Sequence, residues 1–378
     1  MMTIESIHIQ GIPIPVSRVG LGTWAIGGWM WGGADDQASI ATIRGAIERG
    51  VNLIDTAPVY GFGHSEEIVG RALEGIRDRA VIATKVALQW DGGSITRNSS
   101  AARIRQEVED SLRRLRTDRI DLYQVHWPDP SVAFEETAAA LETLRRQGKI
   151  LAIGVSNYAP AQMDAFASAA PLVAVQSPYN LFERAIEADV LPYARDKGLV
   201  VLAYGALCRG LLSGRMRGTT TFSGDDLRRA DPKFQQPRFG EYLAAVDALA
   251  ELARDTYGKS VLALAVRWVL QQGPTIALWG ARRADQLVAI DEVFGWSIAA
   301  ADLARIDALL AQHVLHPVGP EFMAPPLRTP PPELGAASMA CRRCACPWIP
   351  GCGPPGPLVA APMCRPARDT RHLTPKRI

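Results

Sequence analysis

Eight short apolar runs alternate with segments of helical period along this chain, and this alternation constrains the fold more than any other feature. The runs are rich in β-branched residues, as buried parallel strands are. They cover residues 19–24, 53–57, 80–85, 120–126, 150–157, 173–177, 200–204 and 275–280. Between them, apolar residues recur at intervals of three and four. This pattern predicts amphipathic helices that cover a parallel sheet.

The number of strand–helix units favours a closed barrel of the α/β class. Eight units within about 300 residues suit the (β/α)8 TIM barrel. An open doubly wound sheet is the alternative, and it usually carries G-x-G-x-x-G after its first strand. Gly20 and Gly22 supply two of these glycines, but no third follows at the required place. We therefore expect one barrel domain over residues 1–323.

The segment 324–378 differs in character from the rest of the chain. Thirteen of its 55 residues are proline, and it shows neither helical nor strand period. A segment that cannot bury enough apolar surface stays unfolded, so a disordered Pro/Cys-rich C-terminal tail is expected. Its cysteines leave one alternative open, because thiolates at the spacing found here can bind zinc. The four candidate ligands are Cys341, Cys344, Cys346 and Cys352.

Composition and charge exclude several classes of protein. The net charge is +2, which gives no basic field to favour nucleic acid or a membrane surface as partner. No secretory signal and no apolar run long enough to span a bilayer are found, so a cytoplasmic enzyme is expected. Only Cys208 lies before residue 341, which fits a reducing compartment. No metal is expected in the barrel, and the oligomeric state stays open.

Four polar residues follow the apolar runs at positions where barrels carry their chemistry. Asp55, Lys85 and His126 lie at the ends of three successive runs, and Tyr60 comes five residues after Asp55. Each has a structural interpretation when taken alone: a helix N-cap, a solvated lysine, a buried histidine. Together, an acid, a phenol, an amine and an imidazole at the carboxyl ends of barrel strands make a proton-transfer site.

The motifs around these residues resemble those of the aldo-keto reductase superfamily over residues 4–323. The segment 50–61, Gly-Val-Asn-Leu-Ile-Asp-Thr-Ala-Pro-Val-Tyr-Gly, is similar to the family's most specific signature. Residues 19–24, 153–157 and 280–283 also resemble family motifs. The stretches 204–214 and 319–326 are similar to the branch of bacterial general-stress and inositol-related reductases.

The resemblance implies metal-free, reversible hydride transfer between NADPH and an aldehyde or ketone. Tyr60 would donate the proton, and Lys85 beside it would lower the pKa of the phenol. Asp55 would pair with Lys85, and His126 would hydrogen-bond the substrate oxygen.

The resemblance also assigns a cofactor site around the barrel mouth. Tyr204 would stack on the nicotinamide, and Arg209 would lie near the pyrophosphate. Arg282 would meet a 2′-phosphate and so favour NADP(H), whereas the acid Asp291 weakens that preference slightly. A solvated basic turn is the alternative for 282–283. The full set is Gly22, Thr23, Trp24, Asp55, Ser156, Asn157, Gln176, Tyr204, Gly205, Ala206, Leu207, Arg209, Gly210, Leu211, Gly280, Ala281, Arg282, Arg283, Gln286 and Asp291.

The substrate site is expected to be lined by aromatic residues and by the long loop 205–240, which is a candidate lid. An aliphatic or aromatic aldehyde, or a small ketone, fits such a site better than a highly charged sugar phosphate does. The lining set is Trp24, Trp31, Tyr60, His126 and Trp127. Packing at the barrel rim is the alternative role for the three tryptophans. A rival hypothesis is a cofactor-binding regulatory module, as in the β-subunits of potassium channels. The intact set of four polar residues favours the enzyme.

Overall fold

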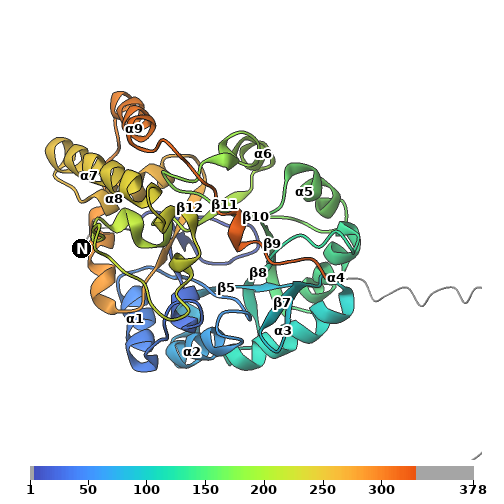
Figure 1. Ribbon diagram of the computed structural model, residues 1–378. Helices are drawn as coiled ribbons and strands as arrows, with labels where there is room; N and C mark the ends of the chain where they lie inside the picture. The colour runs from blue at the N-terminus through green and yellow to red at the C-terminus, as the bar shows by residue number, and fades with distance from the viewer. Residues whose placement is uncertain (1–3, 329–378) are drawn as a thin grey trace, which may run out of the picture. The chain divides into compact units, whose positions relative to one another are not determined.

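The computed structural model describes residues 4–328, which form a closed barrel of eight parallel strands (Figure 1). The predicted barrel is therefore confirmed. Each strand pairs with its two neighbours around the ring, and β12 closes it against β3. The strands are β3 (Val19–Gly22), β4 (Leu53–Asp55), β5 (Val81–Val86), β8 (Ile120–Val125), β9 (Ile150–Ser156), β10 (Ala174–Pro178), β11 (Val200–Tyr204) and β12 (Thr275–Gly280).

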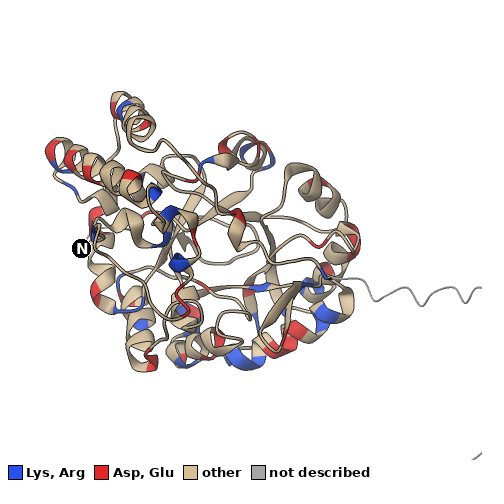
Figure 2. Ribbon diagram, viewed as in Figure 1, with Lys and Arg blue, Asp and Glu red and all other residues tan. Residues whose placement is uncertain are grey.

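Helices surround the barrel and cover its outer face (Figure 1). α3 is typical: Ile104 and Val108 are fully buried, while most of its charged residues are at least partly exposed and Glu107 is the buried exception. Lys, Arg, Asp and Glu are mixed along these outer helices (Figure 2). The helices are α1 (Asp36–Glu48), α2 (His64–Leu73), α3 (Ala101–Leu115), α4 (Phe134–Arg146), α5 (Pro160–Ala167), α6 (Val190–Lys197), α7 (Arg238–Tyr257), α8 (Val261–Leu270) and α9 (Ala300–His313).

The barrel interior is closed at the end where the strands begin. Inward-facing residues such as Leu53, Leu122 and Leu202 pack in one buried cluster with Ile9 and Ile12. The latter two belong to the turn between two short strands, β1 (Ser6–Ile7) and β2 (Val16–Ser17), which pair antiparallel. Because this hairpin plugs the bottom of the barrel, any ligand must enter from the opposite end.

Two connections at the open end depart from the sequence prediction. A hairpin of β6 (Leu88–Asp91) and β7 (Ser94–Arg97) follows β5 and was not predicted. The segment 205–240, predicted as a loop, contains the short 3-10 helices η4 (Cys208–Ser213), η5 (Leu227–Arg229) and η6 (Pro232–Phe234).

The C-terminal boundary also lies later than predicted. Residues 324–328 are part of the packed structure. Arg97 donates from Nε to the carbonyl of Pro325 (2.9 Å) and from its backbone to Pro326 (3.3 Å). A disordered tail beginning at 324 is therefore wrong for these five residues. The remainder of the tail, with its cysteines, lies outside the described residues. Within residues 4–328, no helix has the length and apolarity needed to cross a bilayer.

Candidate active site

The four predicted catalytic residues meet at the carboxyl end of the barrel. Asp55 ends β4, Lys85 lies near the end of β5, and His126 follows β8. Tyr60 lies in the turn after β4, where Gly61 adopts a left-handed backbone (φ 65°). A side chain at Gly61 would collide with the carbonyl oxygen of Gly27, so a glycine is needed for this close approach.

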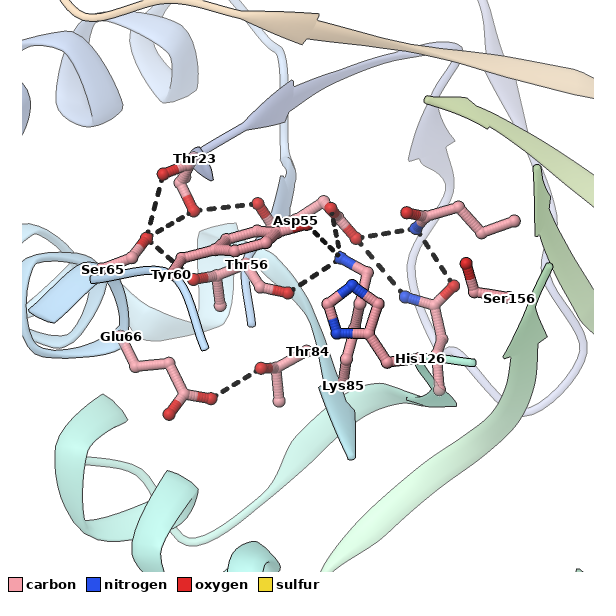
Figure 3. A network of polar contacts seen from close by, with 12 residues as sticks. Thr23, Asp55, Thr56, Tyr60, Ser65, Glu66, Thr84, Lys85, His126 and Ser156 are labelled. Carbon is pink, nitrogen blue, oxygen red and sulfur yellow. Dashed lines mark hydrogen bonds and ion pairs between the residues drawn. The ribbon is translucent and has the colours of Figure 1, made fainter. Parts of the chain in front are cut away.

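A buried ion pair forms the centre of the site (Figure 3). The ammonium of Lys85 donates to Asp55 Oδ2 (2.7 Å), to the carbonyl of Thr56 (3.0 Å) and to the Tyr60 hydroxyl (3.3 Å). The side chains of Lys85 and Asp55 are 1% and 3% exposed. All three ammonium protons thus have acceptors, and one of these is the phenol oxygen.

The second oxygen of Asp55 is held by amides that point inward from two other strands. Gln176 donates to Asp55 Oδ1 (2.9 Å), and Gln124 lies 3.4 Å from the same oxygen. Sequence reasoning assigned Gln176 to the cofactor and missed Gln124. The signal was available: Gln124 precedes His126 by two residues, and side chains two apart on a strand share a face.

Three hydroxyl groups fix the turn that carries Tyr60. Ser65 Oγ lies 2.8 Å from Thr23 Oγ1 and 3.0 Å from Thr56 Oγ1, and the Thr23 hydroxyl donates to the carbonyl of Asp55 (Figure 3). Such a satisfied, buried network leaves the backbone of residues 55–56 little freedom. The Thr56 carbonyl is thereby held against Lys85.

Burial raises the pKa of Tyr60 well above its ordinary value of 10, and the nearby charge of Asp55 raises it further. The sequence analysis expected Lys85 to lower this pKa, and that expectation is wrong for the chain without a ligand. Lys85 is itself neutralised by Asp55, so desolvation of the phenolate dominates. The phenol is therefore protonated at neutral pH, as a proton donor must be.

The other two titratable groups are also governed by burial. Burial lowers the pKa of Lys85, while the carboxylate of Asp55 opposes this shift. Burial lowers the pKa of His126 well below 6.5, and the charge of Lys85 adds to the effect. Among the described residues, neither ring nitrogen of His126 has a hydrogen-bond partner, so a neutral imidazole is free to bond a ligand.

A cavity of about 600 Å³ opens above these residues. It contains most of the residues predicted to bind cofactor or substrate. Those in its lining are Gly22, Thr23, Trp24, Trp31, Asp55, Tyr60, His126, Trp127, Ser156, Asn157, Gln176, Tyr204, Gly205, Leu207, Arg209, Gly210, Gly280, Ala281, Arg282 and Gln286. Lys85 lies beneath this lining.

Four predicted cofactor residues do not reach the cavity lining. Ala206 and Leu211 are fully buried in the core. Arg283 and Asp291 lie on the surface, where they pair with Asp285 and Arg49. The predicted contact of Asp291 with the adenosine therefore stays a prediction.

Arg209 lines the cavity, but its charge is already paired with carboxylates. Its side chain is only 3% exposed, and its guanidinium bonds Glu183 (2.6 Å) and Asp231 (2.5 Å). Two carboxylates neutralise this cation, and its contact with a pyrophosphate stays a prediction. Arg228, which the sequence analysis did not single out, also lines the cavity. Burial lowers the pKa of Arg282, and the charge of Arg228 lowers it further.

Much of the cavity wall was missed because it comes from distant segments. Trp29 extends the aromatic wall, and Leu88 and Ile95 come from the unpredicted β6–β7 hairpin. Phe322, Met323, Pro325 and Pro326 come from the C-terminal segment. No run of sequence marks these residues as neighbours of Tyr60. Residues 4–328 contain no group of three or more His, Cys, Asp or Glu placed to hold a metal ion.

Comparison with known proteins gives the family. Residues 18–311 match the pattern of the Aldo/keto reductase family. The chain is 57% identical to "Aldo-keto reductase YhdN" of Bacillus subtilis, over 86% of this chain and 99% of that protein. It is 37% identical to the "NADH-specific methylglyoxal reductase" of Escherichia coli, over 75% and 91%. The chain therefore belongs to the aldo/keto reductase family, and it is an enzyme of the oxidoreductase class.

Two solved structures are similar to the barrel. The glycerol dehydrogenase AKR11B4 from Gluconobacter oxydans superposes with a TM-score of 0.78 at 57% identity, covering 85% of this chain and all of that one. An aldo/keto reductase from Klebsiella pneumoniae, solved with NADP and acetate, gives a TM-score of 0.64 at 28% identity, covering 82% and 96%.

Proposed function

We propose that this enzyme reduces small aldehydes or ketones to alcohols with NADPH, reversibly, and that Tyr60 is the proton donor. The observation that carries the proposal is the buried contact of Tyr60, Lys85 and Asp55 at the floor of a cavity. A protonated phenol faces the space where a carbonyl oxygen would lie, beside an imidazole without a partner.

The cavity fits a dinucleotide. Gly22 and Gly280 line it, and a Cβ added to Gly280 would meet no atom within 4 Å. Ser156 and Asn157 lie where a carboxamide could be held, and Tyr204 presents its ring, with its hydroxyl fixed to Asn157 Oδ1 (2.9 Å). Gln176 already donates a hydrogen bond to Asp55, so it would orient that carboxylate in addition to contacting the cofactor. When bound, NADPH supplies a hydride to the carbonyl carbon.

The protein's own groups then handle the charge that builds on the carbonyl oxygen. Tyr60 donates its proton to that oxygen, and the Lys85 ammonium stabilises the phenolate that remains. His126 in its neutral form donates a second hydrogen bond and fixes the direction of the carbonyl. The tryptophans and the C-terminal segment exclude water, which strengthens these interactions.

The pH dependence of reduction follows from these pKa directions. The raised pKa keeps Tyr60 protonated until the pH exceeds 10, and the lowered pKa keeps His126 neutral until the pH falls below 6.5. We expect kcat/KM for reduction to be flat between roughly pH 7 and 9. A pH–rate profile at saturating NADPH checks this. A fall with a midpoint near pH 7 to 8 would mean that one of the two groups titrates there.

Cofactor choice is proposed to depend on Arg282. Its guanidinium lines the cavity and is held by the carbonyl of Trp31 (2.8 Å). Because a hydrogen bond to a charged group contributes about 1.5–3 kcal/mol, Arg282→Ala should raise the KM for NADPH by roughly 10-fold to 100-fold. The KM for NADH should change less than about twofold, because NADH lacks the 2′-phosphate. The measurement is steady-state kinetics with both cofactors.

Arg283→Ala is the matched control for this prediction. Arg283 is adjacent in sequence but pairs with Asp285 outside the cavity, so both KM values should stay near wild type. The proposed preference for NADP(H) rests partly on the Klebsiella pneumoniae enzyme solved with NADP. The Escherichia coli relative is described as NADH-specific. An equal loss with both cofactors in Arg282→Ala would therefore contradict a 2′-phosphate contact.

The proposed substrate class is a small carbonyl compound. The cavity lining around Tyr60 is largely apolar and includes Trp24, Trp31, Trp127 and Ile95. The names of two relatives refer to small molecules, glycerol and methylglyoxal. NADPH consumption with a panel of aldehydes and ketones tests the proposal. Tight NADPH binding without turnover of any substrate would favour the rival role as a cofactor-binding partner module.

A further inference from the structure

A buried cluster of four charged side chains lies beside the cavity and is not used by the proposed chemistry. It consists of Glu183, Arg209, Asp231 and Lys233, whose side chains are between 0% and 3% exposed. Two cations and two anions cancel in charge. Burial alone would raise the pKa of Glu183, but Arg209 and Lys233 hold that pKa below its ordinary value.

The cluster joins the loop after β11 to the segment before α7. Arg209 lies in η4, and its neighbours Gly205, Leu207 and Gly210 line the cavity. Glu183 Oε1 accepts from Arg209 Nη2 (2.6 Å) and from Lys233 Nζ (2.9 Å). Asp231 accepts from Arg209 Nε and from the backbone of Lys233 (2.9 Å). Each carboxylate is thus shared by the same two cationic residues.

Lys233 extends the cluster to the C-terminal segment. Its ammonium donates to the carbonyl of Gly319 (3.1 Å), just before η8 (Glu321–Met323). The ring of Phe322 lies 5.7 Å from the Arg209 guanidinium, which gives a second link. Phe322 and Met323 line the cavity. Three hydrogen bonds therefore connect the cofactor loop, which is the loop after β11 that carries Arg209, to the wall of the substrate site. Two of them share Glu183 Oε1, and the third runs from Lys233 to Gly319.

The physics of burial makes this connection stiff. Separating either cation from Glu183 would leave an uncompensated buried charge, which is strongly unfavourable. Arg209 and Lys233 are therefore held together, and the hydrogen bond from Lys233 links them to the carbonyl of Gly319. An apolar residue at 233 would fill the same space without this constraint.

We propose that Lys233 is a positioning residue that couples the cofactor loop to residues 319–326, so that a bound cofactor fixes the wall of the substrate site. This inference rests on the proposed function for the identity of the cofactor. The residue touches no reacting atom, and its effect is on where Phe322 and Met323 lie when the substrate arrives.

Lys233→Met tests the coupling in the full-length chain. Methionine keeps a long unbranched side chain but loses both hydrogen bonds, and it leaves Arg209 alone between two buried carboxylates. The variant is therefore expected to unfold more easily than the wild type, so its exchange is measured under conditions where it is folded. The first readout is hydrogen–deuterium exchange of the amides of residues 321–324, with and without NADPH. We expect NADPH to slow this exchange by roughly tenfold in the wild type and by less than about twofold in the variant.

The second readout compares the effect of Lys233→Met on NADPH binding with its effect on the carbonyl substrate. The Kd of NADPH, measured by fluorescence, should change by less than about threefold, whereas the KM of the carbonyl substrate should rise by roughly tenfold. Lys197→Met, which removes an exposed lysine that lies 3.7 Å from Asp164 on the outer surface, is the control and should change neither.

The outcomes separate the two proposals. Equal NADPH-dependent protection in the wild type and in Lys233→Met overturns the coupling, as does no protection in the wild type. If the variant fails to fold, the absence of NADPH-dependent protection in the wild type still overturns the coupling. Protection and binding without turnover would refute the reductase proposal alone. Turnover without cofactor-dependent protection would refute the coupling alone.

Discussion

Tyr60→Phe should lower kcat/KM for carbonyl reduction by about 10²-fold to 10⁴-fold, the usual contribution of a positioned general acid. The substitution removes one hydroxyl and keeps the ring, which stacks on Trp24 with centroids 5.9 Å apart. The cavity wall and the Lys85–Asp55 pair should therefore persist. Steady-state kinetics with a reactive aldehyde measures the loss, and NADPH fluorescence measures whether cofactor binding stays within about threefold.

Tyr193→Phe is the matched control for this prediction. Tyr193 lies on the outer helix α6, where its hydroxyl bonds Asp164 (2.8 Å). Its loss should leave kcat/KM near the wild-type value. If Tyr60→Phe retained more than about a tenth of wild-type activity, another group would have to supply the proton.

Lys85→Met should have the largest combined effect on activity and stability. The variant leaves Asp55 charged and buried, with only the amides of Gln176 and Gln124 as partners. Breaking a buried pair on one side typically costs about 3–5 kcal/mol in the free energy of unfolding. Activity should also fall by at least about 10²-fold, because nothing would then stabilise the Tyr60 phenolate. Chemical denaturation measures the change in the free energy of unfolding, and the aldehyde assay measures the loss of activity.

Two further variants separate stability from catalysis. Lys85→Met combined with Asp55→Asn removes the unpaired charge and keeps an acceptor for Gln176. This double variant should recover much of the lost stability and remain inactive. Lys149→Met breaks an exposed pair with Glu109 and should cost less than about 1 kcal/mol. Recovery of activity in the double variant would show that Lys85 serves only to balance Asp55.

The barrel could be predicted because each of its strands is recognisable from the strand's own residues. β11 and β12 have the predicted bounds, and the other strands differ by one or two residues at either end. A strand that is buried on both faces is a continuous run of apolar residues, and this run is visible without knowledge of the rest of the chain. The β6–β7 hairpin was missed because its residues, such as Trp90 and Arg97, are only partly buried and lack that signal.

Only part of the site could be predicted, because some of its residues lie at strand ends and others depend on contacts between distant segments. Asp55, Lys85 and His126 are brought together by the barrel itself, because parallel strands end at one mouth. The pairing of Arg209 with Glu183 was missed because Glu183 lies 26 residues earlier in the chain, with no motif linking them. The direction of the Tyr60 pKa was missed because it depends on burial, and burial follows from packing across many segments.

Transfer of deuterium from deuterated NADPH tests the proposed reaction most directly. NADPH labelled at the transferred position would be incubated with the wild-type chain and an aldehyde, and the alcohol would be examined by mass spectrometry. The proposed reaction predicts one deuterium on the carbinol carbon, with product formed far more slowly by Tyr60→Phe. Saturable NADPH binding with no labelled alcohol from any carbonyl in the panel would contradict the assignment as a carbonyl reductase.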